Sequence, residues 1–296
     1  MRLFNVRYFV VQTEATKARV ASLPGVRLVS PPGEWELYAF DDPAPGHAVV
    51  PSFAPVLTFA TFSVKPRPDD SLDFVRLGEE MFAAGRLDVP LVSSPCREID
   101  TCADWNRFRT ALLIDLRYRD RTHALATIER FTRDRHLVLV ASDDPLVTDL
   151  VALARERQTI HIVERSAAPE SSRAARLVWT RDMVKRLLDV IDAIRERVQD
   201  GPIVTSATIE GDFVRVELDR DPDRAFPLWI RQTYFPNWTT PSGEPVYMAT
   251  PTFQLVFATS RDIELRFSRS RAEWAGRLAS LIGLLVIAVV FRSSHN

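Results

Sequence analysis

The sequence is poor in the residues that build phosphate cradles and metal clusters. It contains only ten glycines in 296 residues, and no G-x-G-x-x-G or G-x-x-x-x-G-K-[ST] motif follows any expected strand. A backbone that approaches a phosphate closely needs glycine at that point, so we do not expect an NAD or ATP site. The two cysteines lack the histidines or second cysteine pair that would complete a zinc pattern. The sequence therefore predicts no cofactor and no metal.

Neither sign of charge is in excess. The chain has 38 basic and 39 acidic residues, and only three of the basic residues are lysines. Without a basic surplus, the sequence gives no sign of binding nucleic acid. A signal peptide is also lacking, because Asn5 and Arg7 interrupt the N-terminal apolar stretch and no small-residue cleavage site follows.

Long hydrophobic runs are absent except near the C-terminus. Leu278–Phe291 is 14 residues without charge. Extended back to Trp274, the segment would span roughly 27 Å as a helix, close to the hydrocarbon thickness of a bilayer. Trp274 and Arg292 would then mark the two interfaces. We expect a transmembrane helix over 274–292, with a buried core helix as the alternative.

The remaining chain has ordinary globular composition and divides into three parts. Residues 1–50 predict a small α/β segment. In residues 51–200, short apolar runs alternate with helical stretches, which is typical of an α/β three-layer domain with a mostly parallel sheet. Residues 201–270 predict closely spaced strands, and thus an antiparallel β-sandwich domain that leads into the C-terminal transmembrane helix.

Two acidic segments are candidates for chemistry, and each also has a structural interpretation. Ser142–Pro145 follows an expected strand, where ligands gather in α/β sheets, but Asp144 before Pro145 is typical of a helix cap. Asp219, Asp221 and Asp223 could hold a divalent cation, although a solvated turn fits their neighbouring arginines better. The five histidines are scattered, and no G-x-S-x-G motif is present. We assign no catalytic residue.

The two cysteines, Cys96 and Cys102, have five residues between them. This spacing fits a small disulfide loop in an oxidising compartment. It fits two unrelated free thiols equally well, so the spacing leaves both interpretations open.

The C-terminal region carries the most distinctive motifs. They are a YFPNW segment, a G-x-P-x-Y segment, a TP-x-F segment, an L-R-F strand and a W-x-G entry to the last helix. Their residues are Tyr234, Phe235, Pro236, Asn237, Trp238, Gly243, Pro245, Tyr247, Pro251, Trp274 and Gly276. In this order they resemble the C-terminal end of bacterial multi-pass membrane proteins of the 6-pyruvoyl-tetrahydropterin-synthase-related type, which are similar to GT-C-type glycosyltransferases. The start of the chain, LFNVRYFVVQ, resembles the segment that follows the membrane part of that family.

The resemblance implies that the active site lies in a membrane portion that this sequence does not contain. It implies partners as well: the lipid bilayer, the multi-spanning membrane portion, and a glycan or polyprenyl-phosphate sugar. It places the globular part on the extracytoplasmic face of the cell membrane, which favours the Cys96–Cys102 disulfide. The arginines before residue 278 point the other way under the positive-inside rule.

Three functions follow from these observations. The leading one is a non-catalytic accessory domain of a membrane glycosyltransferase-like protein that shapes or binds the sugar side. The alternative is a membrane-anchored binding or scaffold module unrelated to catalysis. A third is a free-standing α/β hydrolase or transferase that uses Asp143 or the Asp219–Asp223 run.

Overall fold

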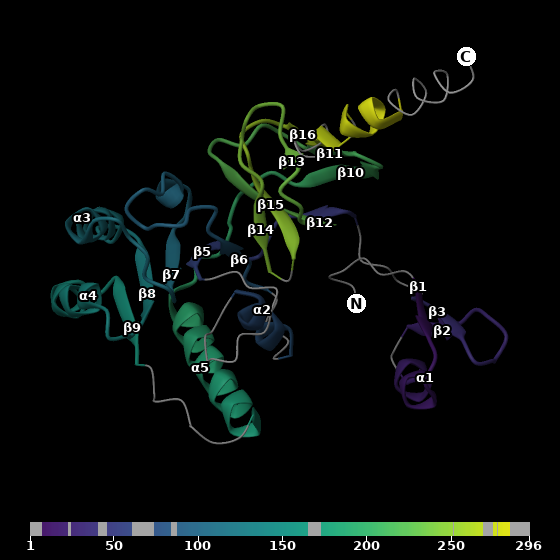
Figure 1. The fold of residues 1–296 in the computed structure, drawn as a ribbon, viewed down its shortest axis with the longest axis horizontal. Coiled ribbons are helices and arrows are strands. Elements are labelled where there is room, and N and C mark those ends of the chain that lie inside the picture. The colour runs from purple at the N-terminus through teal and green to yellow at the C-terminus, as the bar shows by residue number, and fades with distance from the viewer. Residues whose placement is uncertain are drawn as a thin grey trace, which may run out of the picture.

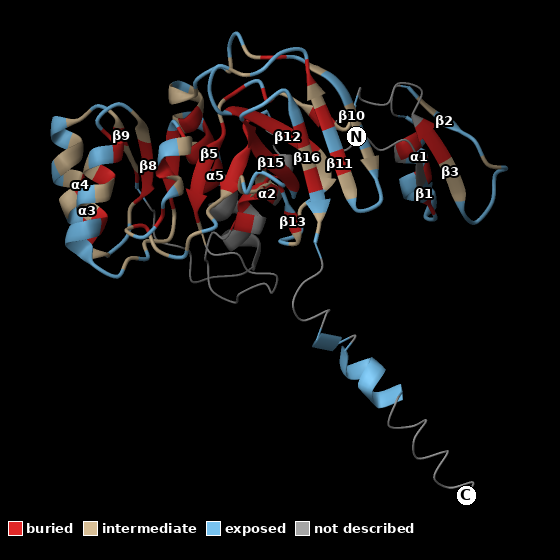
Figure 2. Ribbon diagram, turned by 90° about the horizontal axis from the view of Figure 1, so that it is seen from above, coloured by how far each residue is buried: buried red, intermediate tan, exposed pale blue. Residues whose placement is uncertain are grey.

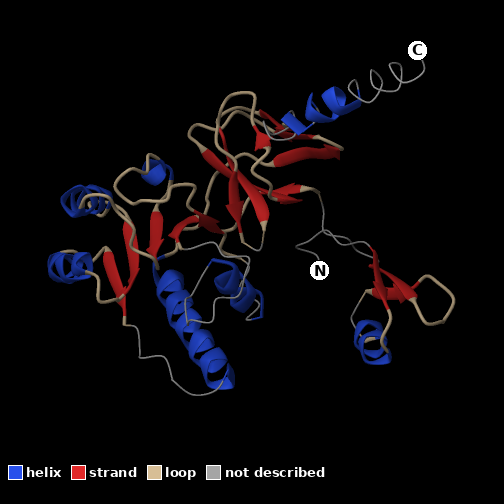
Figure 3. Cartoon of the chain, viewed as in Figure 1, coloured by secondary structure: helices blue, strands red, loops and turns tan. Residues whose placement is uncertain are grey.

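The computed structural model describes residues 8–22, 25–40, 46–60, 74–83, 88–164, 173–250, 252–268, 275–276 and 278–284. Within them lie three sheets, the five helices α1–α5 and a further helical stretch near the C-terminus, arranged as in Figure 1 and coloured by type in Figure 3.

The first sheet belongs to the N-terminal α/β unit and has its own small core. Its strands are β1 (Tyr8–Val11), β3 (Glu36–Phe40) and β2 (Val26–Leu28), in that antiparallel order. Helix α1 (Glu14–Ala21) begins at Thr13, whose side chain accepts a hydrogen bond from the backbone of Thr16, as an N-cap residue does. Val11, Val20 and Tyr38 are buried between the helix and the sheet.

The second sheet is mixed, and it runs through most of the molecule. Its nine strands have the order β4-β12-β15-β14-β6-β5-β7-β8-β9. Five neighbouring strands are parallel: β6 (Leu91–Ser93), β5 (Val56–Phe59), β7 (Thr110–Leu113), β8 (His136–Val140) and β9 (Ile160–Val163). The other four pair antiparallel: β14 (Tyr247–Ala249), β15 (Phe253–Ala258), β12 (Phe226–Thr233) and β4 (Ala48–Val49).

Helices cover both faces of the parallel strands. Helices α3 (Arg121–Phe131) and α4 (Pro145–Glu156) lie on one face, and α2 (Phe74–Ala83) and α5 (Arg173–Ile194) on the other (Figure 1). Side chains alternate between the faces along each strand. In β8, Leu137 and Leu139 belong to the α3/α4 core, whereas Val138 and Val140 belong to the α2/α5 core.

The third sheet completes a sandwich with part of the second. Its antiparallel strands are β10 (Val204–Glu210), β11 (Phe213–Leu218), β16 (Asp262–Phe267) and β13 (Trp238–Thr239). Its inner face packs against β12 and β15, where Leu228, Ile230 and Val256 are buried. The opposite face of the same two strands joins the α3/α4 core through Trp229, Leu255 and Phe257. Figure 2 shows the continuous buried band that results.

The expected separation into a mostly parallel sheet followed by a separate sandwich is therefore wrong. Strands β12, β14 and β15 come from the region expected to form the sandwich, yet they extend the parallel strands into one mixed sheet. The joint is the antiparallel pairing of Ala249 in β14 with Val92 in β6. Pairing between strands so distant in sequence leaves no local pattern, so composition and periodicity could not reveal it.

The expected C-terminal transmembrane helix is also wrong. Within the described residues, no helix combines the length and the apolar character needed to cross a membrane. Only residues 275–276 and 278–284 of the expected segment are described, all of them helical, and the remainder lies outside the described residues. The expectation rested on an uncharged run of 14 residues, which is shorter than the ~20 apolar residues that a spanning helix needs.

Candidate functional site

The parallel strands create a switch point at their carboxyl ends. In the order β6-β5-β7-β8-β9, strand β5 lies between the two strands that follow it in sequence. Open α/β sheets bind ligands in the crevice at such a reversal. Residues 94–107 leave this edge directly after β6, and we call them the disulfide loop.

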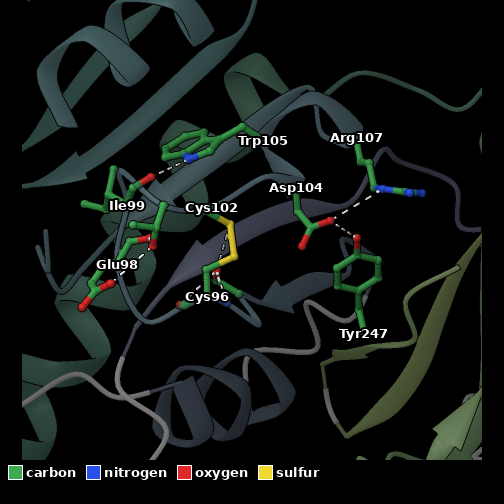
Figure 4. Close-up of a disulfide and its surroundings, with 10 residues drawn as sticks. Cys96, Glu98, Ile99, Cys102, Asp104, Trp105, Arg107 and Tyr247 are labelled. Carbon is green, nitrogen blue, oxygen red and sulfur yellow. Dashed lines mark hydrogen bonds and ion pairs between the residues drawn. A yellow bond between two sulfur atoms is a disulfide. The ribbon is translucent and has the colours of Figure 1, made fainter. Parts of the chain in front are cut away.

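The disulfide loop is closed by a covalent bond. Cys96 and Cys102 are joined through their sulfur atoms, with Cα atoms 5.4 Å apart. Figure 4 shows this bond in yellow. Cys102 is buried and Cys96 is half-buried. Of the two interpretations that the sequence left open, the structure has the disulfide, and neither thiol is free.

Trp105 fastens the disulfide loop to the core. It lies in a short 3-10 helix (Asp104–Arg107), and its indole nitrogen donates a hydrogen bond to the Ile99 carbonyl oxygen at 3.0 Å. Its ring stacks on Phe59 at 5.0 Å between centroids and meets the edge of Phe131 at 4.7 Å. The contact with Phe59 brings the loop against the last residue of β5, and so against the switch point.

A polar network joins the disulfide loop to β14. The Tyr247 hydroxyl donates a hydrogen bond to Asp104 Oδ1 at 2.8 Å, and Arg107 Nε lies 3.6 Å from the same oxygen (Figure 4). Arg107 Nη1 also donates to Glu244 Oε2 at 2.7 Å. Burial raises the pKa of Tyr247, and the hydrogen bond to Asp104 raises it further. The phenol therefore stays a protonated donor at neutral pH.

The same loop holds the one candidate metal group found among the described residues. The sulfur atoms of Cys96 and Cys102 and a carboxylate oxygen of Asp104 lie within 4.8 Å of one another. Metal coordination by cysteine requires the thiolate. While the two sulfur atoms are bonded to each other, neither is a thiolate. In this state the two cysteines close the loop covalently.

Loss of the disulfide should destabilise the protein measurably. For Cys96→Ser/Cys102→Ser we expect the free energy of unfolding to fall by about 2 kcal/mol, because closing a short loop restricts the unfolded chain. Urea unfolding followed by tryptophan fluorescence measures this change. Reductant should lower the free energy of unfolding of the wild type by a similar amount and leave that of the double variant unchanged. If the wild type without reductant and the double variant were equally stable, the prediction would be contradicted.

The aspartates named as candidates for chemistry mainly accept hydrogen bonds from backbone N–H groups. Asp144 is the N-cap of α4, and its Oδ1 accepts hydrogen bonds from the Leu146 backbone at 2.8 Å and from the Tyr118 hydroxyl at 3.0 Å. Asp219 accepts from the Ile203 backbone at 2.8 Å, and Asp221 from the Arg261 backbone at 2.6 Å. Asp143 and Asp223 are exposed. The structure does not gather these carboxylates into one site.

The YFPNW segment fixes the point where the chain leaves the sandwich. Asn237 Nδ2 donates to the Ser268 carbonyl oxygen at 2.9 Å, while the Asn237 carbonyl oxygen accepts from the Ser268 backbone and hydroxyl. Trp238 is buried and packs edge-on against Phe267 at 5.3 Å. Phe235, also against Phe267, remains 52% exposed.

The other motif residues are spread over separate places. Tyr234 follows β12, and burial raises its pKa. Gly243 has a φ of 78° in the loop before β14, and half-buried Pro245 follows. Gly276 is exposed in the C-terminal helical residues. Pro251 and Trp274 lie outside the described residues.

Two of the scattered histidines meet at the edge of the mixed sheet. His136 Nδ1 lies 3.2 Å from His161 Nε2, on neighbouring strands. Burial lowers the pKa of His161, and the charge of His136 lowers it further.

The lowered pKa of His161 predicts that the folded protein loses stability in mild acid. A folded-state pKa below the unfolded value means that the unfolded chain binds more protons, so stability is full above the unfolded pKa of about 6.5 and declines as the pH falls below it. His161→Asn should lessen the difference in melting temperature between pH 7.5 and pH 5, whereas His123→Asn, at an exposed helical position, should not. An unchanged difference in His161→Asn would contradict this account.

Sequence reasoning missed the residues that connect these features. Asp104, Trp105, Arg107 and Glu244 carried no motif of their own, and their partners are as many as 143 positions away. The nearest signals were Cys102, two positions before Asp104, and the G-x-P-x-Y segment that contains Glu244 and Tyr247. Neither indicated that the two segments meet.

Comparisons with known proteins add no further assignment. No protein-family model, curated protein or solved structure gave a significant match to the chain.

Proposed function

We propose that the chain is a non-catalytic accessory module on the extracytoplasmic side of the cell membrane, serving a glycosyltransferase-like protein. The observation that carries the location is the Cys96–Cys102 disulfide. Disulfides persist in oxidising compartments and are rare where thiol reductants circulate. The rigid attachment of the loop through Trp105 and Asp104 supports a structural bond of this kind.

The accessory role is supported by the way the candidate acids are used. Asp144, Asp219 and Asp221 hold backbone groups at a helix start and at turns. A carboxylate committed in this way is poorly placed to act as an acid, a base or a nucleophile, which needs access to substrate. The reaction itself would belong to the membrane portion implied by the family resemblance.

The partner surface in this proposal lies at the C-terminal helical residues. Leu278, Leu281, Ile282 and Leu284 are each 53–65% exposed. Apolar side chains gathered on one short segment mark a site of protein or lipid contact. Asn237 and Ser268 hold the chain at its exit from the sandwich. We expect these side chains to contact the membrane portion or the lipid around it.

The direct test is binding of the full chain to lipid vesicles. Vesicles with a polyprenyl-phosphate sugar should bind it more tightly than vesicles with sugar-free polyprenyl phosphate. Leu281→Glu/Leu284→Glu should weaken binding to both vesicles, whereas Val10→Glu, at an exposed apolar position elsewhere, should weaken neither. Binding that ignores the sugar would favour the scaffold alternative and contradict the proposed glycan role.

A further inference from the structure

Two imidazole rings meet near the amino ends of the parallel strands. His136 is the first residue of β8, and His161 is the second residue of the edge strand β9. The two nearest ring nitrogens, His136 Nδ1 and His161 Nε2, lie 3.2 Å apart. The disulfide loop follows the carboxyl end of β6. The histidine pair therefore lies at the opposite end of the parallel strands, away from the switch point.

The sheet holds both rings on one face. In the parallel register His161 lies beside Val138, which belongs to the α2/α5 core. Because side chains alternate along a strand, His136 shares the face of Val138. Neighbouring Arg135 points the other way, since its guanidinium lies over the ring of Phe131 in the α3/α4 core. The two imidazoles are thus fixed on hydrogen-bonded backbone, and Arg135 puts no competing positive charge on their face.

The separation of the two nitrogens matches that of two ligands of one metal ion. Zn²⁺ holds imidazole nitrogens at about 2.0–2.1 Å in a tetrahedral arrangement, which places two such nitrogens roughly 3.3–3.4 Å apart. The observed 3.2 Å is close to that spacing. Two nitrogens on opposite sides of an ion would lie much farther apart, so the pair fits adjacent positions of one coordination sphere.

The protonation and exposure of the pair are compatible with a metal. Imidazole, with an ordinary pKa of about 6.5, is mostly neutral at pH 7.5 and then carries one N–H and one lone pair. Without a metal, one facing nitrogen donates its proton to the other. With a metal, that proton moves to the outer nitrogen of the same ring, so that both facing lone pairs bind the ion. His136 and His161 are half-buried rather than sealed, which lets water reach the remaining positions.

We propose that His136 and His161 bind one divalent transition-metal ion, with Zn²⁺ as the geometric match and water completing its coordination. Imidazole suits such ions, whereas Mg²⁺ and Ca²⁺ take oxygen ligands. Among the described residues, the disulfide loop holds the only group of three or more candidate ligands, so the protein supplies two ligands at the histidine pair. Two ligands give moderate affinity, and we expect binding in the micromolar range. The bound ion joins the edge strand β9 to β8 and stabilises the fold, because it binds the folded state.

The test is isothermal titration of the full chain, without a polyhistidine tag and at pH 7.5, with ZnCl₂ and separately with MgCl₂. We expect one Zn²⁺ to bind per chain and to raise the melting temperature, whereas Mg²⁺ should do neither. His136→Asn and His161→Asn should each weaken Zn²⁺ binding at least about tenfold, because even the outer-shell partners of a metal are worth that much. His123→Asn, at an exposed position on α3, is the matched control and should bind as the wild type does.

A second measurement needs no variant. In the wild-type chain with isotope-labelled histidine, Zn²⁺ should shift the imidazole nitrogen resonances of two of the five histidines. The assignment is overturned by any of four results: no Zn²⁺ binding, equal binding of Mg²⁺, a folded His136→Asn or His161→Asn variant that binds like the wild type, or shifts in fewer than two histidines. The proposed glycan role does not depend on this site and is tested by the vesicles alone.

Discussion

Trp105→Ala is expected to lower the free energy of unfolding by about 3–5 kcal/mol, the range for removing a large aromatic side chain from a core. The Trp105 ring is 4% exposed and fills the space between Phe59 and Phe131. Its removal leaves a cavity and also strands the Ile99 carbonyl oxygen without its donor. Urea unfolding at neutral pH measures the loss.

The matched control is Trp35→Ala. Trp35 is 58% exposed in the N-terminal unit, so its truncation should change stability by less than 1 kcal/mol. Trp105→Phe keeps most of the ring contacts and should lose less than Trp105→Ala does. If Trp105→Ala were as mild as Trp35→Ala, the loop would not be fastened to the core in the way the contacts indicate.

Gly201→Ala should destabilise the sandwich by about 3 kcal/mol. A Cβ at Gly201 would lie 1.8 Å from a ring carbon of Phe226, far inside van der Waals contact. Phe226 is 5% exposed and packs in the sandwich core, so its ring must shift out of these contacts to admit the added carbon. Inserting a methyl group into a packed core costs typically 1–3 kcal/mol. Thermal unfolding followed by circular dichroism measures the shift.

A second substitution separates the steric clash from other effects at Gly201. In the Phe226→Leu background, Gly201→Ala should cost clearly less, because the smaller side chain makes room for the added carbon. Gly33→Ala serves as the control, since the nearest atom to its new Cβ is 3.9 Å away. Additive losses in the double variant would show that Phe226 does not determine the cost.

Local elements were largely predictable because their signals lie within a few residues. Pro145 after Asp144 predicted the start of α4, and the structure has Asp144 as its N-cap. The sequence alternates on either side of Gly211 as the two strands of a hairpin do, and β10 pairs with β11 around a Gly211 φ of 57°. Helix α5 begins at Arg173, ahead of the amphipathic stretch over 181–198 whose apolar side chains pack on the sheet.

The contacts between segments that lie far apart in the sequence could not be predicted from the sequence. The pairing of β14 with β6 merges two expected regions into one sheet. The hydrogen bond from Tyr247 to Asp104 crosses the same joint. Both depend on the whole fold rather than on local propensity, and without covariation between positions they leave no trace in one sequence. The disulfide is an intermediate case, since its spacing was visible but compatible with two states.

The redox state of Cys96 and Cys102 in intact cells tests the central claim most directly. Cells producing the chain at its natural level would be quenched with an alkylating reagent before lysis, and the cysteine peptides analysed by mass spectrometry. An extracytoplasmic module with a structural disulfide predicts that both cysteines are joined and take up the reagent only after reduction. Complete alkylation of both thiols without reduction would contradict the proposed location.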